Sequence, residues 1–250
     1  MDNITLAVFF VSFVTGLAYV LGVGVITLID LFRYREDLKS AAGQFGLALA
    51  AMAFTCGPHH LIVAYHIVAE GARGGMLELI TVGVGAPFAC VWLWLRLEAF
   101  FGGRGDRIVN GGSTPGTRWV AFVAQMWPAY LVGLGMYWAR VWTHGGVWHP
   151  MVAANIVIAA LYVWIGNLLA TRQRARFLLI HTRSLSGLTL AWIFYTCALM
   201  HLALGYYVWQ GSAYTDWHLH LIDYLSIPFA LWFLAAVYRL YKTGQTVTGA

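Results

Sequence analysis

The chain has 250 residues, of which 60% are of hydrophobic types and only 10% are charged. A soluble domain carries about 25% charged residues, and here the apolar residues also form long runs rather than alternating patterns. This composition excludes a soluble enzyme. It predicts an all-α, polytopic membrane protein surrounded by the lipid bilayer. The net charge of +5 does not indicate a nucleic-acid partner, because basic residues in a membrane protein mainly set its orientation.

The apolar runs predict seven transmembrane helices in a single domain that covers residues 1–250. Gly16, Gly22 and Gly24 in the first helix are expected to allow close helix packing. The longest connection, residues 102–117, is rich in Gly, Ser and Pro, which is typical of a flexible loop. The predicted helices span residues 4–32, 41–69, 76–101, 118–143, 151–171, 186–210 and 218–241.

Arginine and lysine are distributed unevenly between the two sets of connections. The connections after the second, fourth and sixth helices carry only Arg73 and Arg140, and all the other basic residues belong to the opposite set. Because cytoplasmic connections are enriched in basic residues, this pattern predicts an N-terminus outside and a C-terminus in the cytoplasm. We expect a multi-pass protein of the bacterial inner (plasma) membrane.

Three histidines, His59, His60 and His66, lie close together in the second predicted helix. Ionisable groups at membrane depth are costly, so they usually have a function. His59 and His66 share one helical face two turns apart, whereas His60 points about 100° away from His59. No two of them are three or four residues apart, so this helix alone does not supply two ligands to one metal ion. Partners must come from other helices.

His201 in the sixth predicted helix lies at a depth that matches His59 and His60. One imidazole from each of two helices is the arrangement that bis-histidine ligation of a haem requires. His59, His60 and His201 are therefore candidate ligands of a haem b. Pro58 is expected to loosen the helix before the histidine pair, and Gly57 to leave room for a flat ligand against the backbone.

A second group of polar residues lies at the start of the seventh predicted helix. Asp216, His220 and Asp223 are spaced by four and three residues, so they share one face. A carboxylate and an imidazole at this spacing bind one cation together, or one of them orients the other. Asp223 lies inside the span, where its charge needs a partner from the histidines. The candidate metal ligands of this group are His66, Asp216, His218, His220 and Asp223.

Three functions remain open. The first is a membrane-embedded redox protein that binds haem b, or another redox metal, for electron transfer or for oxidation of a lipid-soluble substrate. Its electron partner would be a quinol or a redox protein on the outer side. The second is a metal-dependent membrane enzyme with a non-haem His/Asp site for zinc, iron or copper. The third is a non-enzymatic subunit of a larger membrane complex or a proton-coupled transporter, in which the histidines titrate.

Lysines and cysteines exclude two further interpretations. A retinal protein needs a lysine deep in its last helix, but Lys39 and Lys242 both lie at the cytoplasmic boundary. Cys56, Cys90 and Cys197 lie in apolar runs without CxxC spacing, so we interpret them as small buried hydrophobic residues rather than as a disulfide framework.

Overall fold

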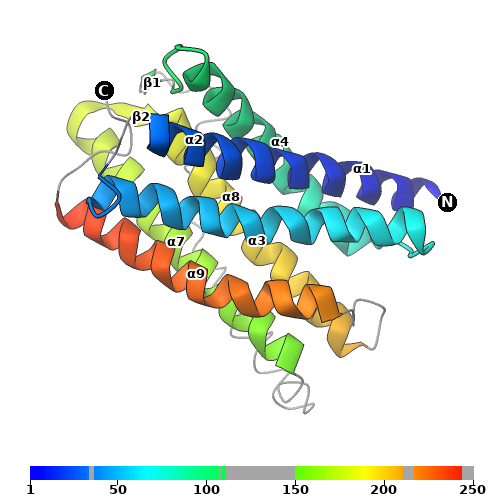
Figure 1. Ribbon diagram of the computed structural model, residues 1–250. Helices are drawn as coiled ribbons and strands as arrows, with labels where there is room; N and C mark the ends of the chain where they lie inside the picture. Colours follow the sequence, from blue (N-terminus) through cyan, green and yellow to red (C-terminus); the bar gives the residue numbers. More distant parts are fainter. Residues whose placement is uncertain (34–36, 107, 111–149, 211–216, 244–250) are drawn as a thin grey trace.

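The computed structural model describes residues 1–33, 37–106, 108–110, 150–210 and 217–243. In this part of the chain, six helices are long and apolar enough to cross a membrane, so the protein is a multi-pass integral membrane protein (Figure 1). The predicted fourth helix, residues 118–143, lies outside the described residues. The elements are α1 (Asn3–Leu17), η1 (Ala18–Val25), α2 (Ile26–Arg33), α3 (Ala41–Ala69), α4 (Met76–Phe100), β1 (Ile108–Asn110), α7 (Pro150–Ile180), β2 (Thr182–Ser184), α8 (Leu185–Trp209) and α9 (Trp217–Lys242).

The first span is one continuous helix in three parts, because the wider π-helical turns of η1 separate α1 from α2. Its glycines lie against neighbouring helices, as predicted. A Cβ on Gly16 would stand 2.9 Å from the carbonyl oxygen of Gly57 in α3, and one on Gly22 would stand 2.9 Å from Cα of Leu93 in α4. At such distances only the hydrogen atom of a glycine fits, and no Cβ does. The first span therefore packs on α3 and α4 through backbone contact.

The interior of the bundle is apolar and aromatic over most of its length. Phe233 of α9 lies between Phe45 of α3 and Phe194 of α8, with ring centroids 4.9 and 5.2 Å away, and it is fully buried. Tyr162 of α7 and Tyr195 of α8 are equally buried. Helix α8 is largely enclosed by its neighbours, and its contacts with α7 and α4 put it near the centre of the fold.

The connection before α8 differs from the sequence prediction. Helix α7 continues to Ile180, beyond the expected end at residue 171, because the arginines of this stretch follow the apolar span without a Gly or Pro that would end it. The chain then forms β2, which pairs antiparallel with β1 in the register Ile108–Ser184 to Asn110–Thr182. Strand pairing in this all-helical protein was not expected. It attaches the connection after α4 to the start of α8.

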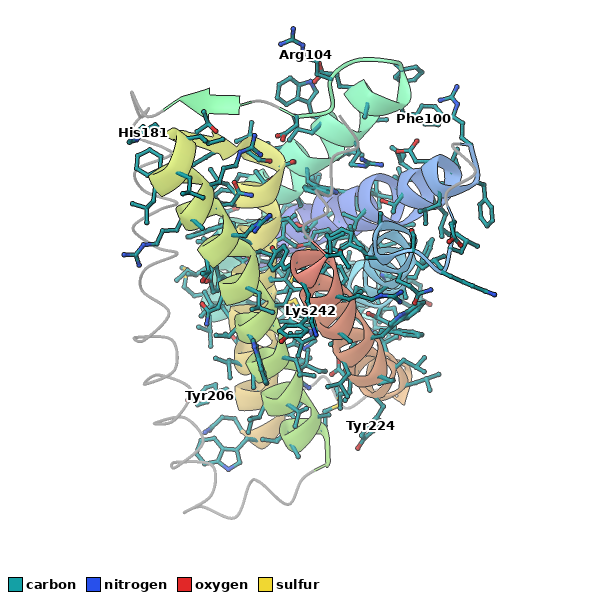
Figure 2. The ribbon with its side chains drawn as sticks, turned by 90° about the vertical axis from the view of Figure 1, so that its left-hand side faces the viewer. Phe100, Arg104, His181, Tyr206, Tyr224 and Lys242 are labelled. Atoms are coloured by element: carbon teal, nitrogen blue, oxygen red, sulfur yellow. The ribbon has the colours of Figure 1, made fainter. Side chains whose placement is uncertain are left out.

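The two ends of the bundle differ in charge. Of the arginines and lysines that the structure describes, every one except Arg73 lies at the end that holds β1, β2 and the C-terminus of α9. We call this the basic end, and Figure 2 views the molecule from it, with Arg104 and Lys242 labelled. Arg96 of α4 pairs there with Asp30 of α2, so the one carboxylate of the first span is neutralised by a neighbouring helix.

Candidate functional site

Asp223 of α9 is the centre of a buried polar cluster between α3, α7, α8 and α9. Its carboxylate is fully inaccessible, and Oδ1 lies 3.3 Å from Nδ1 of His59 and 3.8 Å from Nδ1 of His201. The next residue, Tyr224, points away from the bundle (Figure 2) and is 44% exposed, so the helical rotation of α9 turns Asp223 inward. Two imidazoles from different helices therefore share one carboxylate oxygen.

Asn155 of α7 connects this carboxylate to His201. Its amide nitrogen donates to Asp223 Oδ2 at 2.8 Å and to the backbone carbonyl of Met151 at 2.9 Å. Both partners accept, which identifies this atom as the nitrogen and leaves the amide oxygen to face Nδ1 of His201 at 2.6 Å. Nδ1 of His201 must then carry the proton, so in the neutral ring Nε2 is an unprotonated acceptor.

The cluster has incomplete hydrogen bonding within the part of the chain that the structure describes. His59 Nδ1 and Asp223 Oδ1 are near each other but do not form a hydrogen bond, and His201 Nε2 also has no hydrogen-bond partner among the described residues. The three side chains are at most 2% exposed. Because buried polar atoms are nearly always bonded, the facing pair of His59 Nδ1 and Asp223 Oδ1 and, separately, Nε2 of His201 retain capacity for a proton or a water molecule.

A small cavity of about 20 Å³ adjoins His59 on the side of the bundle opposite the basic end. Its volume is enough for a water molecule, which needs at least about 10 Å³. Glu78, in the first turn of α4, and the buried Ser12 of α1 contribute oxygen atoms, and Ser12 Oγ has no hydrogen-bond partner among the described residues. The polar residues of the lining are Ser12, His59, His60, Glu78, Thr81 and Tyr207.

His60 and His66 lie outside the Asp223 cluster. The His60 ring turns toward Tyr19 of η1, with centroids 5.7 Å apart, as expected for a residue about 100° around the helix from His59. His66 Nδ1 lies 2.7 Å from Glu70 Oε2, four residues later in the same helix region. Asp216 lies outside the described residues, and at His218 and His220 only the helical backbone is described, so their assignment as metal ligands stays a prediction.

The haem interpretation meets a spatial obstacle between His59 and His201. Their ring centroids are 5.5 Å apart with an interplanar angle of 63°, so the two rings are in edge contact and leave no layer for a macrocycle. The space expected beside Gly57 is filled too, because a Cβ there would lie 2.6 Å from Cγ2 of Val20. The residues as arranged leave no space for a haem between these two histidines.

The described part of the chain contains no group of three or more His, Cys, Asp or Glu side chains that could hold a metal ion as arranged. The donor chemistry of His201 nevertheless suits a metal, because metal-ligating histidines usually hold their second ring nitrogen on a carboxylate or carbonyl oxygen. Asn155 supplies such an oxygen. In that case His201 would hold the ion through Nε2, and the ion would supply redox or Lewis-acid chemistry.

The sequence prediction missed several residues of the site. Asn155 is the single amide in the apolar run 151–166, and this was the available signal. Tyr19 and Tyr162 were indistinguishable from ordinary core or interface aromatics. Of the cysteines, Cys56 and Cys197 are buried as expected, whereas Cys90 is exposed, so its interpretation as a buried residue was wrong.

Comparison with known proteins returns no relative. No protein-family model, no curated protein and no solved structure matches this chain. The function therefore has to be inferred from the geometry of the site.

Proposed function

We propose that this is a proton-coupled membrane protein, either a transporter or a proton-conducting subunit of a larger membrane complex, in which His59, Asp223 and His201 bind and release the proton. The observation that carries this proposal is the carboxylate oxygen of Asp223 shared by two imidazoles, all three groups being at most 2% exposed. Intramembrane carboxylate and histidine groups are typical of proton relays. Histidine is also the side chain that ordinarily titrates near neutral pH.

The charge balance of the cluster favours one exchangeable proton. An ionised Asp223 with one protonated imidazole is neutral overall, whereas a carboxylate alone would be a costly uncompensated charge. The second imidazole offers an alternative position for the proton at Nε2, which has no hydrogen-bond partner among the described residues, while its protonated Nδ1 lies 3.8 Å from Oδ1. Asn155 holds the carboxylate from the other side and keeps this geometry when the proton moves.

A route for protons to the Asp223 cluster is supported on one side of the cluster. His59 lines the 20 Å³ cavity while its Nδ1 faces Asp223, so the imidazole stands between a space large enough for water and the buried carboxylate. Glu78, 8% exposed, leads from this cavity toward the end of the bundle opposite the basic end. A proton that enters there would reach Asp223 through His59.

The proposal includes seven spans, with the N-terminus outside and the basic end in the bacterial cytoplasm. Asn110 pairs with Thr182, just after the end of α7, so residue 110 lies at the basic end. Residue 150 begins the 31-residue helix α7 and thus lies about 45 Å along the helix from its end. Residues 110 and 150 therefore lie at opposite ends of the bundle, and this separation supports the predicted span over residues 118–143. The basic end faces the cytoplasm because of its arginines.

Proton translocation by the purified protein in liposomes tests this function. With an imposed membrane potential, the wild-type protein should acidify or alkalinise the lumen, and Asp223→Asn should reduce this flux at least tenfold. His181→Gln is the matched control, because His181 is an exposed histidine after α7, and its flux should equal that of the wild type. Nitrogen-15 NMR of the histidine rings supplies a second readout. If neither flux nor a buried titrating imidazole is observed, the proposal is wrong.

A redox-metal protein is the second candidate, since His201 Nε2 is buried and has no hydrogen-bond partner among the described residues. A haem b would require His59 and His201 to separate or a different ligand pair, and a non-haem copper, iron or zinc ion requires less space. A quinol or an outer redox protein would be the electron partner. An absorption spectrum with metal analysis tests this candidate. The absence of both a Soret band and stoichiometric metal would exclude it.

A further inference from the structure

Two cysteine side chains from distant parts of the sequence meet inside the bundle, next to the Asp223 cluster but not part of it. Cys56 of α3 and Cys197 of α8 are both free thiols and are 7% and 4% exposed. Both line the same internal cavity of about 30 Å³. The rest of this lining is aliphatic or aromatic apart from the thioether of Met52, so the two cysteines are the lining residues that supply thiolate sulfur.

Each sulfur atom has a tyrosine hydroxyl as a partner. Tyr162 Oη of α7 lies 3.0 Å from Cys56 Sγ, and Tyr19 Oη of η1 lies 3.2 Å from Cys197 Sγ. A hydroxyl that donates to sulfur stabilises the thiolate, and hydrogen bonds to sulfur are a common feature around thiolate-bound metals. The π-helical turn of η1 places Tyr19 here, and such turns are frequent at functional sites.

We infer that Cys56 and Cys197 form a two-thiolate binding site for a soft, thiophilic metal ion of the Cu(I) class. Soft thiolate ligands select Cu(I) over harder cations. Two sulfur donors suffice for this ion, so the site needs no third ligand. The cavity exceeds the roughly 10–15 Å³ that a single water molecule requires, so it also admits one bare ion.

The proton balance of this binding step is simple. Two S–H bonds break and two metal–sulfur bonds form, so two protons leave to solvent while one positive charge arrives. The site changes from neutral to a single negative charge, and the hydroxyl groups of Tyr162 and Tyr19 stabilise it by donating to the two sulfur atoms. No electron is transferred, so the step needs no oxidant.

Metal titration of the purified, reduced protein tests this inference with Cu(I) supplied from a chelator buffer under anaerobic conditions. We expect one ion per chain, sulfur-only coordination in X-ray absorption, and at least a hundredfold loss of affinity in Cys56→Ser and in Cys197→Ser. Cys90→Ser is the matched control, because Cys90 is the exposed thiol on α4 and should not contribute. Unchanged binding in both buried-cysteine variants, or no binding by the wild type, would overturn the inference.

A second measurement uses the wild-type protein and so does not depend on the folding of a variant. Cu(I) should slow alkylation of Cys56 and Cys197 by N-ethylmaleimide at least tenfold, and mass spectrometry should show Cys90 labelled at the same rate with and without the ion. If the labelling rate of each of the three thiols is the same with and without Cu(I), the proposed site is contradicted. Asp223→Asn should keep the Cu(I) affinity, which separates this site from the proposed proton function.

Discussion

The amide oxygen of Asn155 lies 2.6 Å from Nδ1 of His201, while the amide nitrogen of the same residue bonds to Asp223. One neutral side chain therefore determines which nitrogen of His201 carries the proton and also holds the carboxylate in place. The sequence prediction assigned the site to histidines and carboxylates alone. The amide between them is what gives the cluster a defined geometry.

Removing this amide should destabilise the protein. Asn155→Ala removes the hydrogen bonds that the buried side chains of Asp223 and His201 make with the amide, and each such loss costs about 1–3 kcal/mol. Thermal unfolding in detergent measures the effect. Asn167→Ala is the control: Asn167 is only half-buried and accepts one bond, from Tyr195, so its loss should be smaller. Equal melting temperatures for Asn155→Ala and the wild type would contradict this role.

The contact between the first span and α3 should not tolerate a side chain at Gly57. A Cβ there would stand 2.6 Å from Cγ2 of Val20 and 3.1 Å from the carbonyl oxygen of Gly16. Gly57→Ala should therefore force the helices apart and cost about 1–3 kcal/mol of stability. Gly83→Ala on α4 meets no atom within 4 Å, and it should be neutral or stabilising by up to about 1 kcal/mol. Similar melting temperatures for the two variants would show that this helix contact is not tight.

Asp106 should keep the first turn of α8 ordered. Its Oδ2 accepts a bond from the Ser184 hydroxyl at 2.6 Å, and its Oδ1 accepts one from the backbone N–H of Ser186 at 2.9 Å. Asp106→Ala should cost about 1 kcal/mol, as the loss of a helix cap does. Hydrogen exchange of residues 184–188 should accelerate, while that of residues 200–208 in the same helix stays unchanged. Uniform protection along α8 in the variant would refute this role.

The number of spans can be measured directly. With seven spans, reporters fused to the N- and C-termini should lie on opposite sides of the membrane, and only the C-terminal one should be active as a cytoplasmic reporter. An even number of spans would place both reporters on the same side. A reporter inserted after residue 74, between α3 and α4, serves as the control for the outer side, because that connection is at the end opposite the basic one. Two cytoplasmic termini would refute the seven-span proposal.

The amino-acid sequence by itself determined the class of protein and the course of most of its helices. Long apolar runs, glycines in the first span and the bias of arginines are local or compositional signals, and the structure agrees with them. Helical periodicity also separated His60 from His59, which was confirmed, because the angle between neighbouring side chains depends only on the helix itself.

Only the tertiary structure decided which residues of different helices meet. Asp223 faces His59 and His201 rather than His66, and Cys56 and Cys197 line one cavity, each beside its own tyrosine hydroxyl, because of how each helix is rotated against its neighbours. That rotation depends on packing over the whole interface, such as the contact of Gly16 with Gly57, and no single helix encodes it. The roles of the thiol pair and of the Asn155 amide therefore follow only from the assembled helices.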